Sequence, residues 1–155
     1  MAYPSLSRRR PAALAALALL LLALLAAGAA AQSIAGLWLI EDGDAVIRIE
    51  RCGATLCGRI VGIGTFASDG AAPRDNLGRS QCGLEIIHAL TEREPGRWFG
   101  TITNPEDGRT YRVRLAQDEA GRLALRGYLG IPLFGSTQLW TPYAGTLTAD
   151  CRMTR

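Results

Sequence analysis

Apolar and polar residues alternate over short segments throughout residues 32–155, which is the pattern of half-buried β-strands. Gly, Asp, Asn and Pro separate these segments, and beyond residue 31 none sustains the 3.6-residue apolar period of a helix. Residues 65–81, rich in Gly, Asp, Ser and Arg, form the one long predicted loop. The alternation predicts eight strands, near residues 36–41, 45–52, 56–64, 84–90, 97–104, 109–117, 122–129 and 136–141.

The turn residues allow two hairpins to be aligned. Residues 104–108 place Pro at the first corner of a turn and Gly where a positive φ is needed. The alignment that keeps apolar residues on one face is well determined, because a one-residue slip sets Arg against Leu. It predicts the pairs Ile102–Tyr111, Gly100–Val113 and Trp98–Leu115, and then, across a turn at residues 118–121, Val113–Leu125 and Leu115–Leu123.

Eight short antiparallel strands with one apolar face predict an all-β protein, a single closed up-and-down β-barrel, because closure leaves no exposed edge strand. A β-sandwich is the alternative. The interior of an eight-stranded barrel is filled by side chains or holds one small ligand. The fold prediction therefore leaves both a packed core and a ligand cavity open.

The N-terminal segment has the organisation of a signal peptide. Three arginines, residues 8–10, precede a run from Pro11 to Ala31 that contains only Pro, Ala, Leu and Gly and ends on Ala29-Ala30-Ala31. We therefore expect residues 1–31 to be removed, leaving residues 32–155 as one periplasmic or secreted domain with no membrane span. An uncleaved membrane anchor is the alternative, because the run is long enough to cross a bilayer. The basic start leaves Sec and twin-arginine export both open.

The charge balance excludes two classes of function. All seventeen basic residues are arginine, and fourteen of them remain after the predicted cleavage, against fourteen Asp and Glu. A nearly neutral mature chain lacks the electrostatic basis for binding nucleic acid. Without lysine, Schiff-base chemistry is excluded as well.

Four cysteines in the predicted exported part indicate two disulfides, since oxidising compartments favour pairing of an even number. A four-residue loop between Cys52 and Cys57 would set them opposite each other, with Glu50 facing Arg59 and Ile49 facing Ile60. The remaining pair would then be Cys82–Cys151, which ties the C-terminal tail to the body. A zinc site is the competing interpretation, but the chain has no Cys-x-x-Cys and a single His.

Several motifs resemble those of known proteins. Gly36-Leu37-Trp38 at the first strand resembles the lipocalin and wider calycin barrels, in which this Trp closes one barrel end. Most of the mature chain is similar to a bacterial secreted family, domain of unknown function 2147. That resemblance implies an exported, lipocalin-like barrel and no established activity. Its motifs are Gly36-Leu37-Trp38, Cys52-Gly53 with residues 56–61, Asp75-Asn76, Gly83-Leu84, Trp98 with Gly100, residues 104–108 with Tyr111, residues 125–128, and residues 138–141.

Six residues are candidates for ligand contact. His88 is predicted to share a strand face with Leu84, Ile86 and Leu90. We expect a hydrogen-bonded core residue, with ligand contact as the alternative. Asp75 and Asn76 in the long loop are expected to cap a turn, or else to meet a ligand or cation at a barrel mouth. The remaining three, which line an apolar cavity or fill the core, are Trp38, Trp98 and Tyr111.

Three arginines are predicted on one polar sheet face. Arg112 is expected directly opposite Arg126, with Arg114 beside them, and this like-charge contact is relieved by solvent, a nearby Glu or an anionic partner. No Gly-x-Ser-x-Gly elbow is present, and no pair of acids stands out by its spacing. We therefore expect no catalytic residue, metal or cofactor.

Two functions fit this sequence. The first is a non-enzymatic barrel that binds a small apolar or amphipathic ligand in its interior. The alternative is a filled barrel that contacts or inhibits an envelope protein through residues 65–81 and the arginine face. An enzyme is the least supported possibility.

Overall fold

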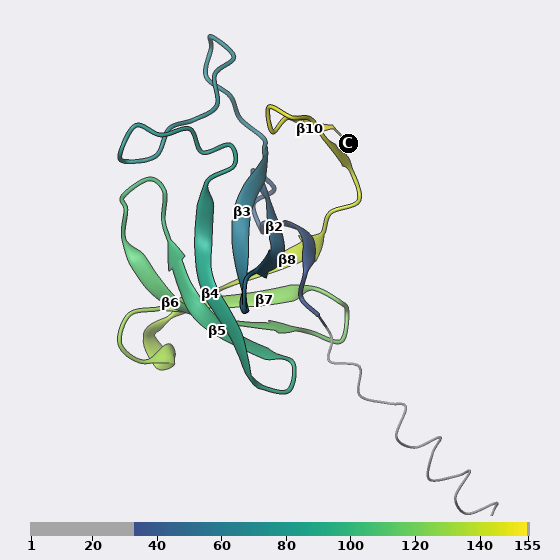
Figure 1. The fold of residues 1–155 in the computed structure, drawn as a ribbon, viewed down its shortest axis with the longest axis vertical. Coiled ribbons are helices and arrows are strands. Elements are labelled where there is room, and N and C mark those ends of the chain that lie inside the picture. The colour runs from purple at the N-terminus through teal and green to yellow at the C-terminus, as the bar shows by residue number, and fades with distance from the viewer. Residues whose placement is uncertain (1–32, 155) are drawn as a thin grey trace, which may run out of the picture. The chain divides into compact units, whose positions relative to one another are not determined.

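The computed structural model describes residues 33–154, so the predicted signal peptide lies outside the described residues. Eight antiparallel strands follow one another around a closed barrel, and β1 pairs with β8 to complete it (Figure 1). This confirms the predicted barrel and excludes the sandwich. The strands are β1 (Gly36–Leu39), β2 (Ala45–Cys52), β3 (Thr55–Ile63), β4 (Glu85–Glu94), β5 (Arg97–Thr103), β6 (Thr110–Gln117), β7 (Leu123–Tyr128) and β8 (Ser136–Pro142).

The alternation of the sequence accounts for the core. Every second residue of a strand points inward, and in the middle of the barrel these positions carry mainly aliphatic side chains that are at most 5% exposed. Side chains from β2, β3, β4, β6 and β7 together fill the middle of the barrel. The inward-facing, buried residues of these strands include Ile47, Ile49, Ile60, Ile87, Val113, Leu115, Leu123 and Leu125.

The hairpin that turns at residues 104–108 has the predicted register. Ile102, Gly100 and Trp98 face Tyr111, Val113 and Leu115 in the structure. The next hairpin differs by two residues, because its turn spans residues 118–122 and sets Leu115 opposite Leu125. Asp118 holds this longer turn by accepting hydrogen bonds from the backbone N–H groups of Ala120 and Arg122.

The hairpin between β2 and β3 also differs from the prediction by two residues. Gly53 and Ala54 form a two-residue turn, so Cys52 faces Thr55 and Cys57 faces Glu50. Gly53 adopts φ 65°, which glycine accepts without strain. The disulfide Cys52–Cys57 is present nonetheless, because the two cysteines lie diagonally on one face with Cα atoms 5.7 Å apart.

The C-terminal tail folds against the outside of the barrel. It forms two further strands, β9 (Thr146–Leu147) and β10 (Met153–Thr154), which the sequence pattern did not predict. The predicted disulfide Cys82–Cys151 fastens it, and the carbonyl of Cys151 accepts a hydrogen bond from Ile63. On the outer surface of the barrel, the side chains of Leu147 and Met153 from the tail lie over Gly62. Val46, beside Gly62, is fully buried there.

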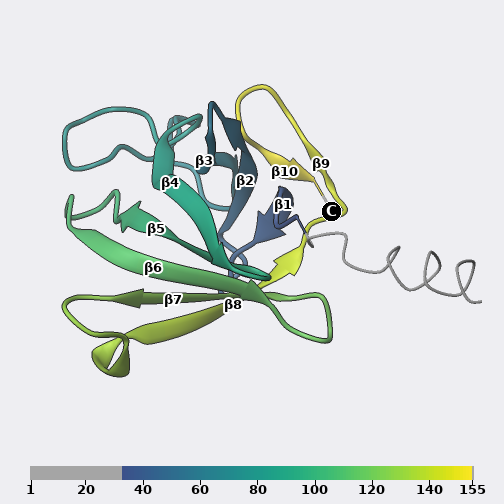
Figure 2. The same ribbon diagram turned by 60° about the horizontal axis from the view of Figure 1, so that its bottom comes forward.

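The two ends of the barrel are built differently. Four connections, including residues 64–84 between β3 and β4, gather at one end, which we call the long-loop end (Figures 1 and 2). The other end carries three short turns, at residues 53–54, 95–96 and 118–122, and we call it the hairpin end. No helix within residues 33–154 has the length and apolar character needed to cross a membrane.

Candidate functional site

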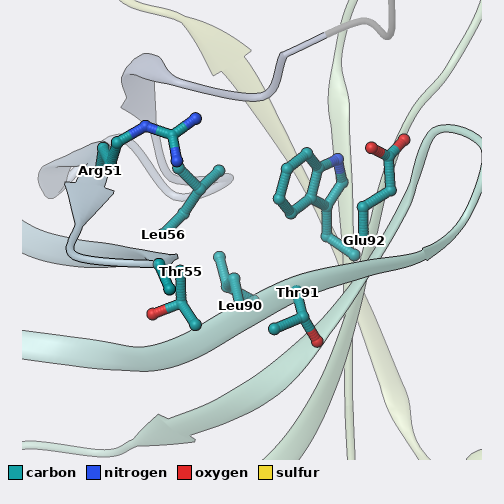
Figure 3. A pocket seen from close by; sticks show the side chains of 8 residues that line it. Arg51, Thr55, Leu56, Leu90, Thr91 and Glu92 are labelled. Carbon is teal, nitrogen blue, oxygen red and sulfur yellow. The ribbon is translucent and has the colours of Figure 1, made fainter.

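A hollow of about 350 Å³ opens at the hairpin end of the barrel, between the β2–β3 and β4–β5 hairpins. Its volume is at the lower end of the roughly 300–1,000 Å³ typical of small-molecule sites. Arg51 and Glu92 lie on opposite sides of it, with Leu56 and Leu90 between them (Figure 3). The lining residues are Arg51, Ala54, Thr55, Leu56, Leu90, Thr91, Glu92 and Trp98.

The tight β2–β3 turn supplies one wall of the hollow. Arg51 follows Ile47 and Ile49 at two-residue intervals, so it occupies an inward position at the end of β2. The register sets Leu56 of β3 directly opposite it. A guanidinium group and a buried leucine therefore lie side by side at the barrel mouth.

A β-bulge in β4 supplies the other wall. Pairing between β4 and β5 shifts between His88 and Thr91, and Ala89 adopts φ 51° within the irregular segment. Leu90 is completely buried as a result, and Glu92 is set opposite Trp98. The bulge thus places an apolar floor and an acidic rim residue in the hollow.

The two charged rim residues differ in their partners. Among the described residues no carboxylate lies within 4.0 Å of the Arg51 guanidinium, and this side chain is exposed. Glu92, by contrast, accepts a hydrogen bond of 2.7 Å from the backbone N–H of Gly96 in the β4–β5 turn. The Arg51 guanidinium is therefore available to a bound anion, whereas the Glu92 carboxylate already stabilises the β4–β5 turn.

Trp98 is the predicted candidate that lines the hollow. Its ring is half-buried, and its Nε1 is buried with no hydrogen-bond acceptor in the described part of the chain. A buried N–H without an acceptor costs about 1–3 kcal/mol. Trp98 therefore combines apolar surface with an unused donor at this end of the barrel.

Trp38 and Tyr111 do not line the hollow. Trp38 is 4% exposed and donates from Nε1 to the carbonyl oxygen of Ile34 at 2.9 Å, so it is a satisfied core residue. Tyr111 faces Ile102 across β5 and β6, near the long-loop end.

His88 lies on the outer surface of β4. The sequence pattern predicted that it shares a face with Leu90, which instead points inward. The bulge that follows it reverses the alternation, which is why a two-residue spacing failed here. Its Nδ1 is 3.0 Å from Glu85, which also accepts a 2.6 Å hydrogen bond from Arg59. The predicted hydrogen bonding is present, but in a half-exposed polar network and not in the core.

Asp75 and Asn76 lie in the loop of residues 64–84 and not in the hollow. Asp75 is buried and accepts backbone hydrogen bonds from Leu77 and Arg79, as well as a 2.7 Å hydrogen bond from the Arg79 side chain. Burial raises the pKa of Asp75, but these hydrogen bonds outweigh it and hold the pKa below its ordinary value. The backbone N–H of Asn76 donates to Pro105, so this pair braces one loop against another.

Sequence reasoning missed Arg51, Leu56, Leu90 and Glu92 as site residues. One signal was available: Arg51 continues the inward phase of Ile47 and Ile49, and a charge in that phase at a strand end indicates a barrel mouth. The contribution of β4 had no such signal, because it depends on a bulge.

Residues 36–142 match the family model described as "Uncharacterized protein conserved in bacteria (DUF2147)". The chain belongs to this family. The DUF2147 match covers all eight barrel strands and stops before β9 and β10. The C-terminal hairpin and Cys151 are therefore outside the matched segment.

The fold of this DUF2147 chain is similar to that of a solved structure. The Helicobacter pylori protein HP1028, described as belonging to the lipocalin family, is similar with a TM-score of 0.60 and 21% sequence identity. The similarity covers 72% of this chain and 84% of that one. At this identity the likeness shows a lipocalin-like fold. No curated protein matches the chain.

Proposed function

We propose that this DUF2147 protein is a non-enzymatic binding protein for a small amphipathic molecule with an anionic group. The observation that carries the proposal is the exposed Arg51 guanidinium, free of any carboxylate within residues 33–154, beside the apolar floor made by Leu56 and Leu90. The lipocalin-like fold supports a binding role as well, since barrel mouths hold small ligands.

The chemistry of the hollow matches the two ends of such a ligand. Leu56 (4% exposed) and Leu90 (0%) are already buried beneath the hollow, so an apolar chain contacts mainly the half-buried Trp98 ring. Each of its methylene groups that leaves water there gains about 0.8 kcal/mol. Arg51 presents a planar fork of N–H donors that fits a carboxylate, sulfonate or phosphate group. Glu92 on the opposite side repels a second anionic group, which would favour one orientation of the ligand.

Export is part of the proposal. The signal-like N-terminus predicts it, and the disulfides Cys52–Cys57 and Cys82–Cys151 support it, because disulfides persist in oxidising compartments. We expect N-terminal sequencing of the protein recovered from cells to begin at Gln32.

The binding proposal is tested with two amphipaths of equal chain length and opposite charge. Dodecanoate is expected to displace the fluorescent anion 1-anilinonaphthalene-8-sulfonate from the mature protein and to change its Trp fluorescence, whereas dodecyltrimethylammonium binds more weakly. Arg51→Gln should weaken dodecanoate binding about tenfold, since an interaction with a charged group contributes about 1.5 kcal/mol or more.

Arg48→Gln is the matched control. Arg48 lies on the same strand but on the outer face, so its loss should leave dodecanoate affinity within about twofold of the wild type. Equal affinity for both amphipaths, unchanged by Arg51→Gln, would contradict an anion-selective site. Failure of every apolar probe to bind would reject the binding function altogether.

A further inference from the structure

The connection between β7 and β8 exposes a cluster of large apolar side chains. This segment, residues 129–135, contains the 3₁₀-helix η1 (Pro132–Phe134) and is called the apolar loop below. It forms a corner of the molecule in both ribbon views, at the yellow-green coil between β7 and β8 (Figures 1 and 2). Its exposed residues are Leu129 (62%), Ile131 (54%), Leu133 (76%) and Phe134 (80%).

Arg126 holds the apolar loop in one conformation. Its Nε donates to the carbonyl oxygen of Pro132 at 2.7 Å, and its other nitrogens donate to Leu133 and to the hydroxyl of Thr137. The backbone of the loop is thereby fixed to β7 and β8 while its apolar side chains remain in water. Such a fixed, exposed apolar cluster marks an interaction surface.

The sheet face beside the apolar loop is positively charged. Arg114 faces Arg126 directly across β6 and β7, and Arg112 faces Tyr128 at the start of the loop. This corrects the predicted pairing of Arg112 with Arg126. No carboxylate among residues 33–154 lies within 4.0 Å of these three guanidinium groups.

The other facing arginines in the barrel show that this is unusual. Arg48 faces Arg59 across β2 and β3, but there Glu50 and Glu85 both lie within 4.0 Å of Arg59. Directly opposed like charges destabilise a sheet unless an opposite charge intervenes. At Arg114 and Arg126 no carboxylate of residues 33–154 lies this close, so the repulsion is left to solvent ions or to an anionic partner.

We infer that the apolar loop and Arg112, Arg114 and Arg126 form a docking surface for an anionic lipid bilayer. The loop inserts Leu133 and Phe134 among the acyl chains at the interface, and Arg112 and Arg114 contact lipid phosphates, while Arg126 holds the loop. A bilayer fits better than a protein, because the apolar residues stand on a projecting corner and a fluid interface accommodates such a shape. This surface is separate from the hollow, which is lined by residues of β2–β5.

Vesicle sedimentation tests this inference with the mature, disulfide-bonded protein. We expect at least about tenfold stronger binding to vesicles of phosphatidylcholine with phosphatidylglycerol than to phosphatidylcholine alone, and release as the salt concentration rises. Two variants, Leu133→Ser/Phe134→Ser and Arg112→Gln/Arg114→Gln, should each weaken binding about tenfold or more. Neither pair contributes to the core, so both variants should keep the circular dichroism spectrum and Tm of the wild type.

Two controls separate this surface from other exposed groups. Leu77→Ser removes an apolar side chain that is 71% exposed in a different loop, and it should leave vesicle binding unchanged. Arg51→Gln should also leave it unchanged, so a failed ligand site and a failed docking surface are distinguished. Equal binding to both vesicle types, full binding by the loop variant, or no binding at all would overturn the inference; in the last case an acidic protein becomes the partner to seek.

Discussion

Gly100 lies where strand β5 passes closest to the bulge of β4. A Cβ added at this position would lie 2.5 Å from the carbonyl oxygen of His88 and 2.9 Å from Leu90 Cδ2. Gly127 on β7 is different, because a Cβ there would meet no heavy atom within 4 Å. The absence of a side chain at Gly100 is therefore what lets the bulge bring Leu90 beneath the hollow.

Gly100 and Gly127 should therefore respond differently to an added side chain. Gly100→Ala should lower the free energy of unfolding by about 1–3 kcal/mol, because backbone atoms on both strands must move apart. Gly127→Ala should stay within about 0.5 kcal/mol of the wild type. Urea denaturation of the two variants measures the difference, and equal midpoints would contradict the close crossing.

Asp75 gives a prediction on pH. Its folded pKa is lowered by hydrogen bonds from Arg79 and Leu77, so its contribution to stability is full above the unfolded pKa of about 3.9. That contribution is lost as the pH falls through the folded value. Asp75→Asn should therefore lower the Tm at pH 7, and its deficit should shrink between about pH 5 and pH 2.

Glu119→Gln is the control for this pH series. Glu119 is exposed in the β6–β7 turn and makes no hydrogen bond or ion pair with the described residues, so its Tm should follow the wild type at every pH. A constant deficit of Asp75→Asn across the whole pH series would show that the ionised carboxylate is not what stabilises the loop.

At the scale of elements, turn chemistry decides how well register can be predicted. The turn at residues 104–108 has a Pro and a Gly at defined corners, and the strands it joins have the predicted register. The two-residue errors at the other hairpins arose because Gly53 allowed a tighter turn and Asp118 held a longer one. Since both errors are even, the paired side chains of these two hairpins stayed on their predicted faces, whereas the bulge in β4 moved His88 to the other face.

Disulfides give the prediction at this scale. The Cys82–Cys151 bond closes a separation of 69 residues and Cys52–Cys57 one of only 5. By the loop-entropy model, replacing the first pair with Ser should lower the free energy of unfolding by about 4 kcal/mol, and replacing the second by about 2 kcal/mol. Urea denaturation of the two double variants compares them. A larger loss from the Cys52–Cys57 pair would contradict the role of the tail bond.

At the scale of the whole molecule, the sequence predicted the barrel but not the position of its opening. Alternation over eight segments was enough for the fold, since inward positions along the chain share one apolar core. The hollow needs two hairpins to meet in space, and one of them depends on the bulge at Ala89. The alternation of residues along a single strand does not show which hairpins lie beside each other in the folded barrel.

We have proposed that an anionic amphipath binds at the hairpin end beside Arg51. NMR titration of the ¹⁵N-labelled mature protein with dodecanoate tests it most directly, because it reports where the ligand lies. We expect the largest shifts at the amides of Thr55, Leu56 and Thr91 and at the indole N–H of Trp98. Shifts confined to the long-loop end or to residues 129–135, or no shifts at all, would contradict it.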